Sequence, residues 1–126
     1  MNMVLAVAAG GALGAVARYF GAGYIGRLLG LDFPVGILAV NIIGSFLMGV
    51  LVEASALVWS PSPELRAFIA VGFLGAFTTF STFSMEAVLL YERGQGLAAA
   101  LYVGLSVGLS LGAFLLALSL MRSLLS

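Results

Sequence analysis

The sequence predicts an all-α integral membrane protein with four transmembrane helices, the third of them broken. Of the 126 residues, 63% are hydrophobic and only 8% are charged, so a soluble domain of this length could not bury its apolar surface. Each spanning helix needs about 20 apolar residues, and four spans with short connections therefore nearly use up the chain. The break is predicted by a polar run inside one apolar segment. We expect residues 1–126 to form a single transmembrane domain.

Turn and capping residues divide the chain into the four spans. These are expected roughly over residues 3–24 (with an extension to 29 allowed), 35–52, 65–90 and 95–121. Pro34 stands at a helix-start position, and Ser62, Pro63 and Glu64 have the N-cap, first-position and first-turn chemistry of another helix start. An even number of spans puts both termini on the same side of the membrane.

The basic residues give no preferred orientation. Arginine is the only basic side chain: Arg66 and Arg122 lie on the terminus side, whereas Arg27 and Arg93 lie on the other side and Arg18 leans toward it. Because no side has an excess of positive charge, insertion in both orientations is the favoured interpretation, although five arginines could also be balanced by chance. Two oppositely inserted copies would form an antiparallel homodimer with its two-fold axis in the membrane plane.

The third span contains the polar run GFLGAFTTFSTFSME, over Gly72–Glu86. Hydroxyl side chains alternate there with aromatic rings, including Phe80 and Phe83, and every polar group in hydrocarbon needs a partner. Hydroxyls compete with the backbone for hydrogen bonds, and two glycines weaken the helix just upstream. We therefore expect a break near Gly75–Thr79, together with a lined passage or a polar packing seam.

Polar side chains on the other spans each allow a functional and a structural interpretation. Tyr102, Ser106 and Ser110 recur every four residues on one helix face and offer a stripe of hydroxyls, unless the serines bond back to their own helix. Asn41 could donate to an anion or join two helices. Arg18 either snorkels to the interface or gives an entrance a positive potential. All of these groups are donors, which is what replaces the hydration shell of a small anion.

Glycines at a spacing of four residues predict close helix packing. Gly10 and Gly14 form one such pair, and Gly104, Gly108 and Gly112 form a stripe on the fourth span. Small residues at this spacing let helices approach closely. The stripe is offset by two residues from the hydroxyl stripe, so we expect it on the opposite face of that helix.

Three motifs make the chain resemble the Fluc-type fluoride channels, a family of small bacterial membrane proteins. They are GGALGAVARY at Gly10–Tyr19, VNIIGSFLMG at Val40–Gly49 and GFLGAFTTFSTFSME at Gly72–Glu86. The resemblance covers nearly the whole chain. It implies a channel, not an enzyme, that forms an antiparallel dual-topology homodimer with two pores. It also implies passive export of fluoride across the inner (plasma) membrane of a bacterial cell, which lowers fluoride toxicity.

The resemblance further implies roles for individual residues. Ring edges, an amide and hydroxyls would line the fluoride path, from Phe80, Phe83, Asn41, Tyr102, Ser106 and Ser110. Arg18 would lie in a vestibule, and the backbone carbonyls of Gly75 and Thr78 from both subunits would hold a structural sodium ion. The implied partners are fluoride, membrane lipid and a second copy of the chain; no nucleic acid is expected.

Two other functions stay open. A small dual-topology exporter of drugs or guanidinium compounds would have a similar size and arrangement. Such exporters need a glutamate inside the first span, and this first span has Arg18 and no acid. The chain could also be a structural membrane subunit that transports nothing.

Overall fold

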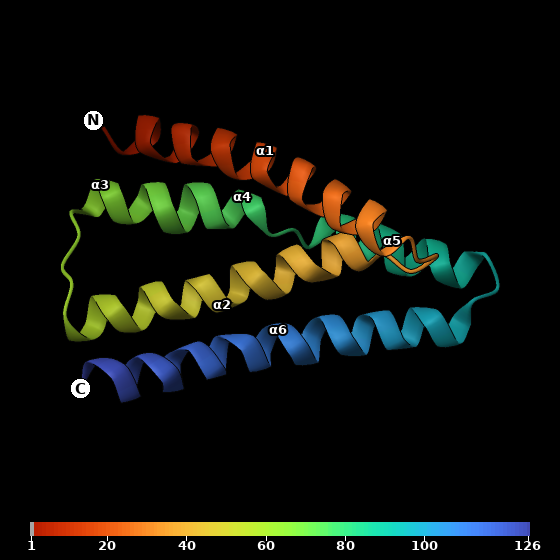
Figure 1. Ribbon diagram of the computed structural model, residues 1–126. Coiled ribbons are helices and arrows are strands. Elements are labelled where there is room, and N and C mark those ends of the chain that lie inside the picture. The colour runs from red at the N-terminus through yellow and green to blue at the C-terminus, as the bar shows by residue number, and fades with distance from the viewer. Residues whose placement is uncertain (1) are drawn as a thin grey trace.

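The chain folds into a bundle of four long helical segments that run up and down between two ends (Figure 1). The structure, a computed structural model, describes residues 2–126. The segments that are long and apolar enough to cross a membrane are Met3–Leu29, Val35–Leu57, Pro63–Glu92 and Gly96–Leu125. Both termini lie at the same end of the bundle (Figure 1). The predicted all-helical, four-span fold is confirmed, and the chain is a multi-pass membrane protein.

Local sequence signals set the ends of the first two helices. Helix α1 (Met3–Leu29) begins where the Asn2 side chain accepts a hydrogen bond from the Leu5 N–H, at 2.8 Å, and it ends at Gly30. Gly30 has a left-handed backbone (φ 60°), which glycine adopts without steric cost. Helix α2 (Val35–Leu57) starts directly after Pro34, as predicted, and continues past the expected end.

The third span consists of several helical pieces: α3 (Pro63–Arg66), the π-helix η1 (Ala67–Leu74), α4 (Gly75–Phe77) and α5 (Ser81–Glu92). Ser62 caps α3 as predicted, since its hydroxyl accepts from the Leu65 N–H at 3.1 Å. The chain leaves the helix at Thr78, whose backbone is extended (φ −91°, ψ 162°). The predicted break is therefore confirmed, at the C-terminal end of the expected range. Helix α6 (Gly96–Leu125) forms the fourth span.

Glycines bring α1 into contact with the backbone of η1. A Cβ atom on Gly10 would collide with the carbonyl oxygen of Phe68, and one on Gly14 would collide with the carbonyl oxygen of Phe73. The two helices can approach this closely only because these positions lack a side chain. The packing role predicted for Gly10 and Gly14 is confirmed.

The two faces of α6 differ, but the glycine face is the open one, contrary to the prediction. Tyr102 and Ser106 are buried, with exposed fractions of 0% and 5%. On the opposite face, a Cβ atom on Gly104, Gly108 or Gly112 would meet nothing within 4 Å. The packing expected for these three glycines is therefore not made by any residue in the described part of the chain.

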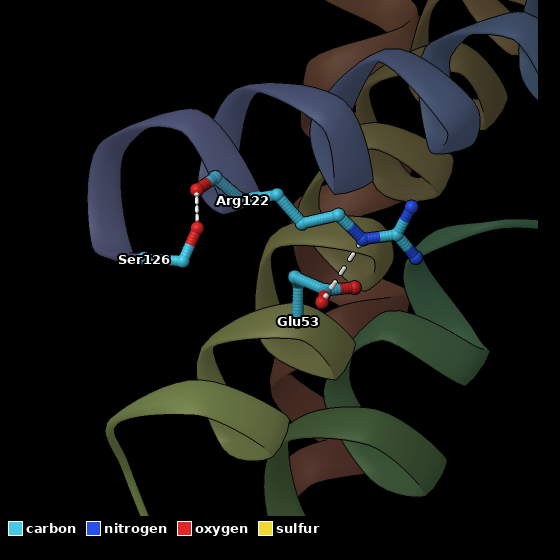
Figure 2. A network of polar contacts seen from close by, with 3 residues as sticks. All are labelled: Glu53, Arg122 and Ser126. Atoms are coloured by element: carbon cyan, nitrogen blue, oxygen red, sulfur yellow. Dashed lines mark hydrogen bonds and ion pairs between the residues drawn. The ribbon is translucent and has the colours of Figure 1, made fainter.

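An ion pair joins α2 to α6 at the end of the bundle that holds the termini. Arg122 Nε lies 3.1 Å from Glu53 Oε1, and the hydroxyl of Ser126 donates to the carbonyl of Arg122 (Figure 2). Glu53 is only 8% exposed. A buried carboxylate is costly unless it is paired, so Arg122 allows α2 to carry Glu53 inside the bundle.

The close approach of α1 to η1 makes a stability prediction. We expect Gly14→Ala to destabilise the protein by about 1–3 kcal/mol, because the new methyl group has to displace the backbone at Phe73. Gly26→Ala is the matched control on the same helix, since its Cβ atom would meet nothing within 4 Å. Thermal unfolding in detergent measures the difference. Equal midpoints for the two variants would contradict the packing described.

Candidate functional site

The side-chain amide of Asn41 holds the break in the third span. Its Nδ2 donates to the Thr79 carbonyl at 3.0 Å, and its Oδ1 accepts from the Thr79 N–H at 2.8 Å. These two bonds replace those that the Thr79 backbone would make in a continuous helix. The structure thus gives Asn41 the helix-joining role. One Nδ2 hydrogen is not used by Thr79 and can serve another acceptor.

The break also redirects two backbone donors. In a continuous helix, the N–H groups of Thr79 and Thr82 would pair with the carbonyls of Gly75 and Thr78. Instead, the Thr79 N–H is donated to Asn41, and the Thr82 N–H is donated to the Thr79 hydroxyl at 3.2 Å. The two carbonyls predicted to hold a cation are thus among those that lose their helical donors at the break.

A cavity of about 490 Å³ lies at the break. It gathers all of the predicted path and cation residues except Tyr102; its walls include Asn41, Gly75, Thr78, Phe80, Phe83, Ser106 and Ser110. These residues come from α2, the two sides of the break and α6. The cavity therefore combines an amide, hydroxyls and aromatic rings on a largely apolar wall.

The two predicted phenylalanines lie in different environments. Their ring centroids are 5.5 Å apart, with the ring planes tilted by 51°. Phe83 is 8% exposed and packs against the Tyr102 ring at 5.3 Å, which fixes its position. Phe80 is 77% exposed. The Phe83 ring is thus held by the core of the chain, whereas the Phe80 ring projects away from that core.

The serines of α6 line the cavity, and their hydroxyls make no hydrogen bond to the described chain. The Oγ atoms of Ser106 and Ser110 are buried and have no hydrogen-bond partner among residues 2–126. By contrast, the hydroxyls of Thr78 and Ser84 each bond back to the carbonyl four residues earlier, at 2.9 Å. The interpretation in which the α6 serines bond back to their own helix is therefore wrong in this structure.

Tyr102 does not share the cavity with the two serines. Its hydroxyl donates to Glu86 Oε1 at 3.0 Å, and its ring lies behind Phe83 and edge-on to Phe33. The role of Glu86 was left open by the sequence. A carboxylate at membrane depth needs a partner, and that requirement was the signal that could have pointed to this pair.

Arg18 lies beside the first turn of α5 and is not among the residues that line the cavity. Its Nη1 donates to the Thr82 hydroxyl at 3.5 Å, and its Nε is buried without a partner among residues 2–126. Ser45 and Thr79 line the cavity and were missed as site residues. Ser45 follows Asn41 by one helical turn, and this spacing was available in the sequence.

Comparison with known proteins identifies the family. The family described as CrcB-like protein, camphor resistance (CrcB), matches residues 5–118. The protein named fluoride-specific ion channel FluC of Rhodospirillum centenum is 58% identical over 103 residues, which are 82% of each chain. The FluC of Rhizobium etli is 47% identical over 124 residues, which cover 98% of this chain and 99% of that protein. The chain therefore belongs to the CrcB-like family.

Proposed function

We propose that this chain is a fluoride-specific channel. The cavity at the break carries the proposal, because Asn41, Ser106 and Ser110 bring donors to one place that Phe80 and Phe83 also line. Fluoride is small and strongly hydrated, so only several donors at once can replace its water. Phenylalanine rings add positive edges that can face an anion. Relatives named as fluoride-specific ion channels support the same function, which is that of a channel and not of an enzyme.

The transport is passive export across the inner membrane of a bacterial cell. Hydrogen fluoride enters uncharged, ionises in the more neutral cytoplasm and is trapped there as the anion. An inside-negative potential then drives fluoride outward by about 2.3 kcal/mol per 100 mV. Tyr102 supports the path from behind Phe83, with its hydroxyl donated to Glu86, and Arg18 raises the positive potential of a vestibule. Such a channel lowers the toxicity of cytoplasmic fluoride.

The working unit is an antiparallel homodimer with two pores. Phe80 is 77% exposed at the break, and the glycine face of α6 meets nothing within the described chain. A second copy would cover such surfaces, and the balanced arginines favour its opposite insertion. Each pore would then receive a phenylalanine from each subunit.

A structural sodium ion would lie at the dimer interface. The break diverts the helical donors of the Gly75 and Thr78 carbonyls, and hard cations prefer oxygen ligands. Among residues 2–126, no group of three or more His, Cys, Asp or Glu side chains could hold a metal instead. The ion would satisfy carbonyls from both subunits and would not be transported.

The rival exporter function is disfavoured by the charges at the site. Such exporters depend on a membrane-embedded carboxylate that binds a cation. No carboxylate is among the residues that line the cavity at the break. Within the described part of the third span, Glu86 is engaged with Tyr102.

The direct test of the function is efflux from liposomes that contain only this protein. We expect purified protein to release trapped fluoride, recorded with a fluoride electrode, while chloride in parallel liposomes is retained. Empty liposomes are the control. Release of neither ion would favour a structural subunit, and release of a guanidinium compound without fluoride would favour an exporter.

The proposed dual topology predicts labelling from both sides. The chain has no cysteine, so a single cysteine at Ser60 in the loop between α2 and α3 can be labelled selectively. In sealed vesicles, a membrane-impermeant thiol reagent should label about half of the copies, because the arginines give no orientation bias. Complete labelling, or none, would mean a single orientation.

The amide of Asn41 predicts a charge effect that can be separated from its joining role. In Asn41→Asp, one oxygen can still accept from the Thr79 N–H, but a negative charge enters the proposed path. Fluoride flux should fall more than about tenfold, since a like charge at 4 Å costs about 1 kcal/mol in water and several in a drier site.

Asn41→Ala is the control for the lost hydrogen bonds, because it removes both bonds to Thr79 without adding charge. It should retain more flux than Asn41→Asp, while size-exclusion chromatography shows both variants still assembled. Equal flux in the two variants would leave Asn41 with the joining role alone.

A further inference from the structure

We propose that Ser45 is a further fluoride-contacting residue, which carries the line of donors from the cavity at the break into a second cavity. The inference rests on the proposed channel function. It adds a hydroxyl on α2 to a path whose other hydroxyls are on α6.

The position of Ser45 follows from that of Asn41. Both residues belong to α2 and are four positions apart, so they share a helix face with a rise of about 6 Å between them. Both line the cavity at the break. Asn41 is fixed by its two bonds to Thr79, and this fixes the direction in which the next turn of α2 faces.

A second, smaller cavity of about 210 Å³ begins where the first one ends. Four residues are shared by the two cavities: Ser45, Thr78, Ser110 and Leu111. The second cavity continues past Met48 of α2 and Phe114 of α6. Both helices run from there toward the end of the bundle that holds the termini (Figure 1). Ser45 thus stands on the shared wall, between the break and that end.

The hydroxyls on this shared wall differ in what they bind. The Thr78 hydroxyl is engaged with the carbonyl of Leu74 at 2.9 Å. The Ser110 Oγ is buried without a partner, and none of the side-chain hydrogen bonds among residues 2–126 involves Ser45. A buried hydroxyl without a partner, such as that of Ser110, is unfavourable, and an anion between α2 and α6 would accept from Ser110 and Ser45 together.

The alternative role for Ser45 is that of a small packing residue. Its neighbour Gly44 has that role, because a Cβ atom there would collide with the side chain of Thr78. A packing role requires only a small side chain, so alanine would replace Ser45 without loss. A donor role requires the hydroxyl. The two roles therefore predict opposite results for the same substitution.

The test compares Ser45→Ala, Ser45→Thr and the unchanged chain in fluoride efflux from liposomes. We expect Ser45→Ala to lower fluoride flux about tenfold, the size of one lost hydrogen bond to a charged group. Ser45→Thr keeps the hydroxyl and should restore most of the flux. Ser55→Ala is the matched control: Ser55 is also on α2, its buried hydroxyl has no partner among residues 2–126, and it lines neither cavity. Its flux should equal that of the unchanged chain.

A second measurement does not depend on the loss of the hydroxyl. A cysteine introduced by Ser45→Cys is the only one in the chain, and a negatively charged methanethiosulfonate reagent should modify it and stop fluoride flux. Ser55→Cys should not be affected. If the unchanged chain conducts and Ser45→Ala matches Ser55→Ala, or if Ser45→Cys resists the reagent, the inference on Ser45 is overturned. Absence of flux in the unchanged chain would overturn the channel function itself.

Discussion

The structure depends on one constraint, which is that a helix broken inside a membrane must satisfy its own backbone. Hydrocarbon offers no hydrogen bonds, so the groups released at the break need partners from the protein. Asn41, which is 38 positions from Thr79 in the sequence, supplies both a donor and an acceptor to its backbone. The Thr79 hydroxyl then accepts from the N–H of Thr82, in the first turn of α5. The break is thus a built feature that fixes α2 against both halves of the third span.

The close packing around the break keeps it in place. Gly10 and Gly14 let α1 lie directly against the backbone of η1, upstream of the break. Downstream, Phe83 packs between the break and Tyr102, whose hydroxyl is bound to Glu86. Rigid elements on both sides position a site more precisely than a loop would. The cavity at the break is lined by α2, by both sides of the break and by α6.

The polar groups at and near this cavity divide into those that are hydrogen-bonded within the fold and those that remain available to bind a ligand. Thr78 and Ser84 return their hydroxyls to the helix backbone, and Tyr102 is committed to Glu86. Ser106 and Ser110 have no such partner among residues 2–126. This division could not be assigned from residue types, because serine and threonine make both kinds of contact in membrane helices.

The sequence by itself determined the features that depend on local chemistry. Span number follows from the length of apolar runs, the start of α3 from the cap at Ser62, and the break from hydroxyls and glycines that weaken the helix. Only the tertiary structure decided that Asn41 pairs with Thr79, that Tyr102 lies behind Phe83, and that Ser45 joins the site. Each residue turns a helix by about 100°, so the faces of distant helices meet in a register that is set by packing and not by local sequence.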